Sequence, residues 1–289
     1  AKTFGTSSIM IGDATTGTID AANYNVGLGV DVFAALTSGD DNIAIGFAAL
    51  DANTTASNNV GIGSNALGAV TTGSNNIGIG KDTGGAITTG AHNVAIGKDA
   101  GDAITTGNYN VVVGKGALTE NTTASNNTAL GYIALKENTT GTRNVAVGSE
   151  AADANTTASN ITAVGYQALS ANTTGADNTA VGKNAMDVNE TGSQCVAVGV
   201  DALGAQVSGA HYNVAIGHSA LKAQTTASNN TAVGFSALTA NTDGHSNTAI
   251  GSAAGDAITT GDRNTSLGHD AGSTLTEGSD NVFIGQLAG

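Results

Sequence analysis

"TAVGYQALSANTTGADNTAVG", residues 162–182, begins and ends with the same four residues. The glycine that closes this motif recurs 17 times along the 289-residue chain, from Gly12 to Gly285. Fifteen of the 16 spacings are 17 residues and the remaining one is 18. A period this strict predicts an internally repetitive architecture rather than a set of separate domains. We therefore expect one repetitive domain, 1–289, without a linker.

The 18-residue spacing lies between Gly199 and Gly217. Gly209 still follows Gly199 at the distance seen in other repeats, and Asn213 again precedes its glycine correctly. We therefore place the extra residue at 210–212.

Each repeat ends in a β-rich segment such as Asn178–Gly182, and the rest of the repeat is rich in the Gly, Asn and Thr typical of turns. Seventeen residues are too few for two packed helices. The sequence therefore predicts an all-β fold, a parallel β-solenoid of about 17 coils with 17 residues per coil. Each strand would pair with its copies in the neighbouring coils, at a spacing of roughly 4.8 Å.

The repeating glycine, here called the column glycine, always follows an aliphatic residue and stands where the chain leaves the strand. We expect either a positive φ at this corner or a backbone approach too close for a Cβ atom. The predicted structural coil corners are Gly29, Gly46, Gly63, Gly97, Gly131, Gly165, Gly182, Gly217 and Gly251.

Four residues before the column glycine, Asn occurs in 14 of 17 repeats. Stacked amides can hydrogen-bond along a solenoid, each to the next. Ile161 and Cys195 interrupt the series, which indicates that the column is enclosed and that Cys195 is an inert buried thiol. The predicted Asn ladder comprises Asn25, Asn42, Asn59, Asn76, Asn93, Asn110, Asn127, Asn144, Asn178 and Asn213.

A second pattern indicates how the core is filled. Four residues after the column glycine the usual residue is Leu, and three residues later stands Asn, as in Leu50 and Asn53. Where Gly replaces this Leu, the later residue becomes a large aliphatic one, as in Gly84 and Ile87. Two positions that share one core pocket would vary in this way, because cores conserve volume.

Composition restricts the function. The net charge is −14, which is the wrong sign for neutralising nucleic-acid phosphates. There is no stretch of 18 apolar residues, so we expect no membrane insertion. The five histidines are scattered without the spacing of metal ligands. We find no catalytic constellation, and we expect a protein that is not an enzyme and that uses no cofactor or metal.

Two surface features suggest binding partners. Along the strand, Val94 and Ile96 point one way while Asn93 and Ala95 point the other, so neither face is a charged solvent face. This pattern predicts that copies of the chain pack on each other as a homo-oligomer. Separately, stacked threonines such as those at 88–89 would suit an ice-binding surface, although they would equally suit turn hydrogen bonds.

The motif Asn-Val-Ala-Ile-Gly at 93–97 and 213–217 resembles the head repeats of YadA-like trimeric autotransporter adhesins. The fuller pattern at 165–182 is similar to 17-residue repeats of phage tail-fibre-type proteins. The resemblance implies a left-handed β-roll, a trimer, a location outside the cell or on a virion, and a cell-surface or glycan receptor. It identifies no receptor-binding residues.

These observations lead to three functional hypotheses. The first is a non-enzymatic structural and adhesive fibre protein, a rigid solenoid shaft of tail-fibre or adhesin type. The second is a subunit of a self-assembling extracellular filament, an end-to-end polymer, because the repeat runs in phase to both ends of the sequence. The third is an ice-binding solenoid.

Overall fold

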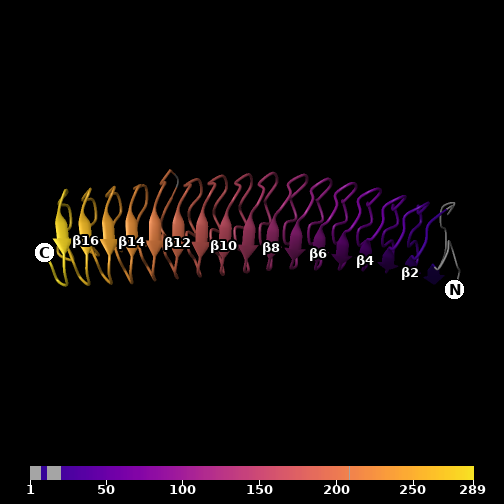
Figure 1. Ribbon diagram of the computed structural model, residues 1–289, viewed down its shortest axis with the longest axis horizontal. Helices are drawn as coiled ribbons and strands as arrows, with labels where there is room; N and C mark the ends of the chain where they lie inside the picture. The colour runs from indigo at the N-terminus through magenta and orange to yellow at the C-terminus, as the bar shows by residue number, and fades with distance from the viewer. Residues whose placement is uncertain (1–7, 12–20, 208) are drawn as a thin grey trace. The chain divides into compact units, whose positions relative to one another are not determined.

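The computed structural model describes residues 8–11, 21–207 and 209–289, and these residues are all-β, without a helix (Figure 1). Within these described residues, seventeen strands of three residues each recur at the end of successive repeats. Their bounds are β1 (Ile9–Ile11), β2 (Val26–Leu28), β3 (Ile43–Ile45), β4 (Val60–Ile62), β5 (Ile77–Ile79), β6 (Val94–Ile96), β7 (Val111–Val113), β8 (Thr128–Leu130), β9 (Val145–Val147), β10 (Thr162–Val164), β11 (Thr179–Val181), β12 (Val196–Val198), β13 (Val214–Ile216), β14 (Thr231–Val233), β15 (Thr248–Ile250), β16 (Thr265–Leu267) and β17 (Val282–Ile284).

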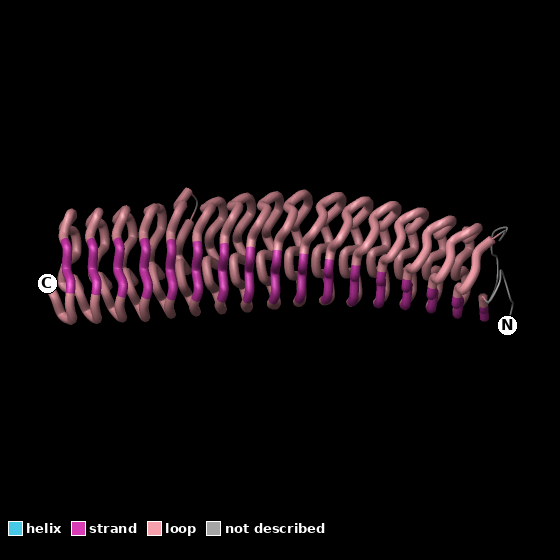
Figure 2. Tube along the Cα trace, viewed as in Figure 1, coloured by secondary structure: helices cyan, strands magenta, loops and turns pink. Residues whose placement is uncertain are grey.

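The chain forms two compact units, Ala1–Arg143 and Asn144–Gly289. The first contains β1–β8 and the second β9–β17. Within each unit, consecutive strands pair in parallel and in register, so that Val94 lies opposite Val111 and Thr162 opposite Thr179. Figure 2 shows the strands of each unit side by side, with turns joining one coil to the next. The predicted parallel β-solenoid is thereby confirmed.

The 18-residue coil keeps this strand register, since β12 and β13 pair with Val196 opposite Val214. The extra residue, however, does not lie at 210–212. The N–H of Val207 donates to the carbonyl of Thr225, so Val207 is in the register of the other coils. The side chain of His211 already accepts the N–H of Ser193, the contact that residue 210 would make in a 17-residue coil. The insertion therefore falls between Val207 and Ala210, outside the pairing strands.

A 17-residue coil closes around a three-residue strand because several residues outside the strand adopt left-handed backbone angles. In the coil that follows Gly165, these residues are Gln167 (φ 53°), Leu169 (φ 56°) and Asp177 (φ 59°). Such angles are unfavourable for residues other than Gly, Asn and Asp. Hydrogen bonds between coils offset the cost: the N–H of Leu169 donates to the carbonyl of Ala185 at 2.9 Å, and that of Asp177 to Ser159 at 3.1 Å.

The core is a thin column of small and medium side chains inside each coil. The middle residue of the strand, usually Ala, is buried, as are the Leu four residues and the Asn seven residues after the column glycine; Ala163, Leu169 and Asn172 are all 0% exposed. Because each coil contributes the same few side chains, the core has the same cross-section from coil to coil. Stability then depends on contacts between neighbouring coils.

Candidate functional site

The outward face of the strands is apolar and exposed in both units. In β1–β16 the first and third residues point outward while the middle residue is buried, as in β7 and β9. Away from the ends of each unit, Ile79 is still 36% exposed, Val111 38% and Ile216 40%. In the first unit, one of the 16 outward strand residues is Thr, whereas five of 18 are Thr in the second unit. The first unit therefore presents the more apolar surface.

Aromatic side chains border this outward sheet face on both sides. Some directly follow the column glycine and others lie five residues before the next one, at the start of the strand segment. Two of them stack on histidines of the preceding coil, Tyr109 on His92 at 4.9 Å and Phe235 on His218 at 5.5 Å between ring centroids. The exposed members, between 45% and 60% exposed, are Tyr24, Phe47, Tyr109, Tyr132, Tyr166, Tyr212 and Phe235.

The column glycines stand at the corner where the chain leaves the strand. The nine predicted coil-corner glycines have φ between 125° and 143°. At eight of them, from Gly29 to Gly251, a Cβ atom would lie 2.0–2.8 Å from the carbonyl oxygen of the next column glycine. Conformation and close backbone approach thus both require glycine here.

The ladder asparagines lie inside the coil and bind the backbone more than one another. In the stretch around Asn76, each Oδ1 accepts the N–H of the next ladder residue, as from Asn93 at 3.0 Å. Each Nδ2 donates to a carbonyl fourteen residues ahead, as from Asn76 to Gly90 at 2.9 Å. Direct amide-to-amide bonds, such as Asn93 to Asn76 at 3.1 Å, occur as an additional contact. The ladder is therefore mainly a side-chain bridge between backbones.

Two residues interrupt this ladder, and different neighbours take over the missing contacts. At Ile161, the carbonyl of Gly175 is reached instead by Nδ2 of Asn178, at 3.2 Å. At Cys195, Gln206 reaches into the ladder: its Nε2 donates to the carbonyl of Ala210 at 3.4 Å. Its Oε1 also accepts Nδ2 of the next ladder residue, Asn213, at 3.2 Å.

Cys195 is 0% exposed, and burial raises the pKa of its thiol above the ordinary value. Both effects oppose attack by a thiol reagent, because the reactive species is an accessible thiolate. We expect no modification of the native protein by a chromogenic disulfide reagent at neutral pH, and modification of the single thiol after denaturation in guanidinium. Rapid labelling of the native protein would show that this coil opens readily.

The predicted exchange of core volume is visible in the contacts. A Cβ atom on Gly84 would lie 2.9 Å from Cδ1 of Ile87, and one on Gly101 would lie 2.8 Å from Cδ1 of Ile104. The later aliphatic residue thus occupies the space that Leu fills in other coils. At Gly272 the nearest atoms belong to Ser266 and Phe283 instead, so the exchange there has a different partner.

The two threonine positions differ in their contacts. The first, eight residues after the column glycine, donates its hydroxyl to the carbonyl of its counterpart in the next coil, as from Thr54 to Thr71 at 3.0 Å. The second is exposed. In the first unit, six consecutive coils carry Thr at this second position: Thr55, Thr72, Thr89, Thr106, Thr123 and Thr140.

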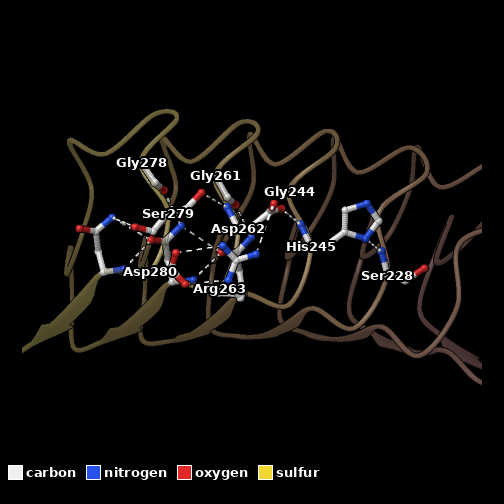
Figure 3. A network of polar contacts seen from close by, with 12 residues as sticks. Ser228, Gly244, His245, Gly261, Asp262, Arg263, Gly278, Ser279 and Asp280 are labelled. Carbon is white, nitrogen blue, oxygen red and sulfur yellow. Dashed lines mark hydrogen bonds and ion pairs between the residues drawn. The ribbon is translucent and has the colours of Figure 1, made fainter.

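A further column of side chains, not predicted from the sequence, caps the turns. At this turn-acceptor column, eleven residues after the column glycine in a 17-residue coil, the side chain accepts the N–H of its counterpart in the preceding coil. Figure 3 shows this series in the second unit, where Ser228 donates to His245, His245 to Asp262 and Asp262 to Ser279. In the sequence, this column is marked by a preference for Ser, Asn, Asp, Thr or His at one repeat position.

Four carboxyls five residues after a column glycine have pKa values raised by burial; they are Asp51, Asp102, Asp187 and Asp256. A raised folded-state pKa means that these groups favour folding at low pH and lose that contribution as pH rises through the folded value. Asp187 borders an open recess of about 310 Å³ beside Gly204. The ion pair between Lys222 and Asp201, 3.1 Å apart, lies in the same recess, so its charges are largely compensated internally.

In the part of the chain that the structure describes, no three His, Cys, Asp or Glu side chains converge on a point that could hold a metal ion. The same residues contain no helix long and apolar enough to cross a membrane. Comparisons with protein-family models, curated proteins and solved structures find no match.

Proposed function

We propose that this protein is a non-enzymatic structural repeat protein that serves as a stiff spacer, a shaft of adhesin or tail-fibre type outside the cell. The observation that carries the proposal is the regular bonding between coils. Backbone hydrogen bonds, the Asn ladder and the threonine hydroxyls all join one coil to the next. A stack tied at so many points resists bending and local opening, which is the mechanical property a spacer needs.

The outward sheet face supports a homo-oligomeric assembly. In the first unit, eight strands of three residues each, at about 4.8 Å spacing and about 3.3 Å rise per residue, give a strand face of roughly 400 Å². A standard protein interface buries roughly 800 Å² per partner, so the strands supply about half of that area and the bordering aromatic side chains extend it. An exposed apolar surface of such extent is typical of an interaction site. The resemblance to trimeric adhesin heads favours three copies, whose exposed turns would contact a cell-surface or glycan receptor.

Charge placed on the outward face tests the assembly. We expect the double variant Ile79→Lys/Val111→Lys to fold, because both side chains already reach solvent, but to sediment as a monomer. The native chain is expected to sediment as a discrete oligomer in analytical ultracentrifugation. Thr106→Lys, exposed and away from the strands, is the matched control and should remain oligomeric.

If the native chain sedimented as a monomer, the proposed homo-oligomer would be wrong, and the outward sheet face would not be an assembly surface. Fibres of indefinite length, seen by electron microscopy and unaffected by the double variant, would favour end-to-end polymerisation instead.

The exposed threonine column favours ice binding as a second candidate. Six threonine side chains repeat at about the strand spacing in the first unit, a regular array that could order water. The neighbouring threonine column donates its hydroxyls to backbone carbonyls, which supports a turn role for that column. Thermal hysteresis distinguishes the two uses: activity lost in Thr89→Lys would support ice binding, and no activity in the native protein would exclude it.

A further inference from the structure

The turn-acceptor column contains two histidines that each accept a backbone hydrogen bond. The N–H of Ser193 donates to Nδ1 of His211 at 3.0 Å. The N–H of Ser228 donates to Nδ1 of His245, also at 3.0 Å. In Figure 3 the imidazole of His245 points back toward the backbone nitrogen of Ser228. Each bond joins one turn of the second unit to the next.

These two bonds require neutral imidazoles. A neutral ring carries one N–H and one acceptor nitrogen, whereas a protonated ring donates from both nitrogens and accepts from neither. Imidazole is the side chain that ordinarily changes charge between about pH 5 and 8. Serine hydroxyls hold the same position in other coils, as when Ser228 accepts the N–H of His211 at 3.0 Å, and these do not titrate.

We propose that His211 and His245 are acid-sensitive hydrogen-bond acceptors that hold two turns of the second unit closed. When a proton binds Nδ1, the imidazole faces the backbone N–H with a donor, so the hydrogen bond is lost and the ring turns away. The turns at Ser193 and Ser228 then loosen, while turns held by serine stay closed. The bonds are present at neutral pH and lost as pH falls. This device is independent of the proposed spacer role.

The charged groups around each ring define its setting. Beside His211, the column neighbours Ser193 and Ser228 are uncharged, and the ring of Tyr212 lies 6.0 Å away. His245 has Asp262 in the following coil, which accepts its backbone N–H at 2.7 Å.

Beyond Asp262, Arg263 is held by Asp280, with Nε 2.7 Å from Oδ1. In the turn of His245 itself, Asp243 accepts the hydroxyl of Thr226 from the preceding coil at 3.1 Å.

Amide hydrogen exchange, measured by residue on the full chain at about pH 8 and about pH 5 and corrected for intrinsic rates, tests the proposal. We expect protection of the Ser193 and Ser228 amides to fall about tenfold on acidification, the loss of one hydrogen bond. The amides of Asn108 and Asp262, whose acceptors are the hydroxyls of Ser125 and Ser279, serve as internal controls and should keep their protection.

The variants His211→Ser and His245→Ser supply the acceptor that other coils use, so they should fold and stay protected at both pH values. Equal protection of Ser193 and Ser228 at the two pH values in the native chain would overturn the proposal. So would an acid-dependent loss that persists in the serine variants, because the cause would then lie outside the imidazoles.

Discussion

Gly63→Ala is expected to destabilise the first unit by about 3–5 kcal/mol. Gly63 has φ +134°, and an added Cβ would lie 2.2 Å from the carbonyl oxygen of Gly80 and 2.6 Å from its carbonyl carbon. Both neighbouring atoms are backbone of the next coil, so they can give way only if the two coils separate. Hydrogen bonds around the corner, such as the N–H of Gly63 to the carbonyl of Ile45 at 2.7 Å, would be strained with it.

Gly85→Ala is the matched control in the same unit. A Cβ at Gly85 would meet its nearest neighbours, Nδ2 of Asn65 and the carbonyl of Asp82, at 3.5 Å, an ordinary contact distance. Its effect should therefore be within about 1 kcal/mol and could be stabilising, because alanine restricts the unfolded chain. Urea unfolding followed by circular dichroism measures both. Equal midpoints for the two variants would contradict the corner role of the column glycines.

Asn76→Leu is expected to cost about 3–5 kcal/mol, because several buried groups lose partners that each count for about 1–3 kcal/mol. Oδ1 of Asn76 accepts the N–H of Asn93 at 3.0 Å, and Nδ2 donates to the carbonyl of Gly90 at 2.9 Å. The side chain is 0% exposed, so water cannot replace these contacts without opening the coil.

The adjacent Asn75 offers the comparison, since it is exposed and lies outside the ladder. Asn75→Ala should cost less than about 1 kcal/mol, mostly for its left-handed backbone angle. Unfolding midpoints and residue-level hydrogen exchange report both variants. If Asn76→Leu left the exchange of the Asn93 amide unchanged, the ladder would not be a support of the backbone.

The repeat pattern was enough to predict the fold. A spacing of 17 residues, one β-rich segment per repeat and a glycine at a fixed place leave little choice besides a parallel stack of coils. The exchange between Leu and a later aliphatic residue also predicted a shared core pocket. This prediction is confirmed at Gly84, where Cδ1 of Ile87 occupies the space that a side chain on Gly84 would enter. Both signals come from comparing the chain with itself.

The features that could not be predicted from the sequence are mainly backbone angles and contacts with backbone groups. Leu169 adopts φ 56°, an angle that no propensity for leucine would predict, because hydrogen bonds to neighbouring coils impose it. For the same reason the ladder amides bind backbone groups rather than chiefly one another. The role of Gln206 beside Cys195 was hidden because the two residues are eleven positions apart and meet only when the coil closes.

The outward sheet face and the turn-acceptor column also could not be predicted fully from the sequence, because both depend on how the coil closes. Alternation along the strand indicated two apolar faces, but the sequence could not show which face the coil would enclose. The turn-acceptor column had a compositional signature, yet its meaning depends on a distance between consecutive coils. The pairing of Ser193 with His211 further depends on the extra residue, which the sequence placed a few positions too late.

That extra residue shows that the coil length is not fixed by the strand register. Between Val207 and Ala210 the chain gains a residue while β12 and β13 stay in register. Gly209 stands at this place with φ 86°, and the space where a Cβ would project has no atom within 4 Å. Ancestral copies of the repeat could thus lengthen by insertion at this turn without disturbing the stack. The same turn is therefore a suitable position at which to insert a foreign peptide for display on a repeating scaffold.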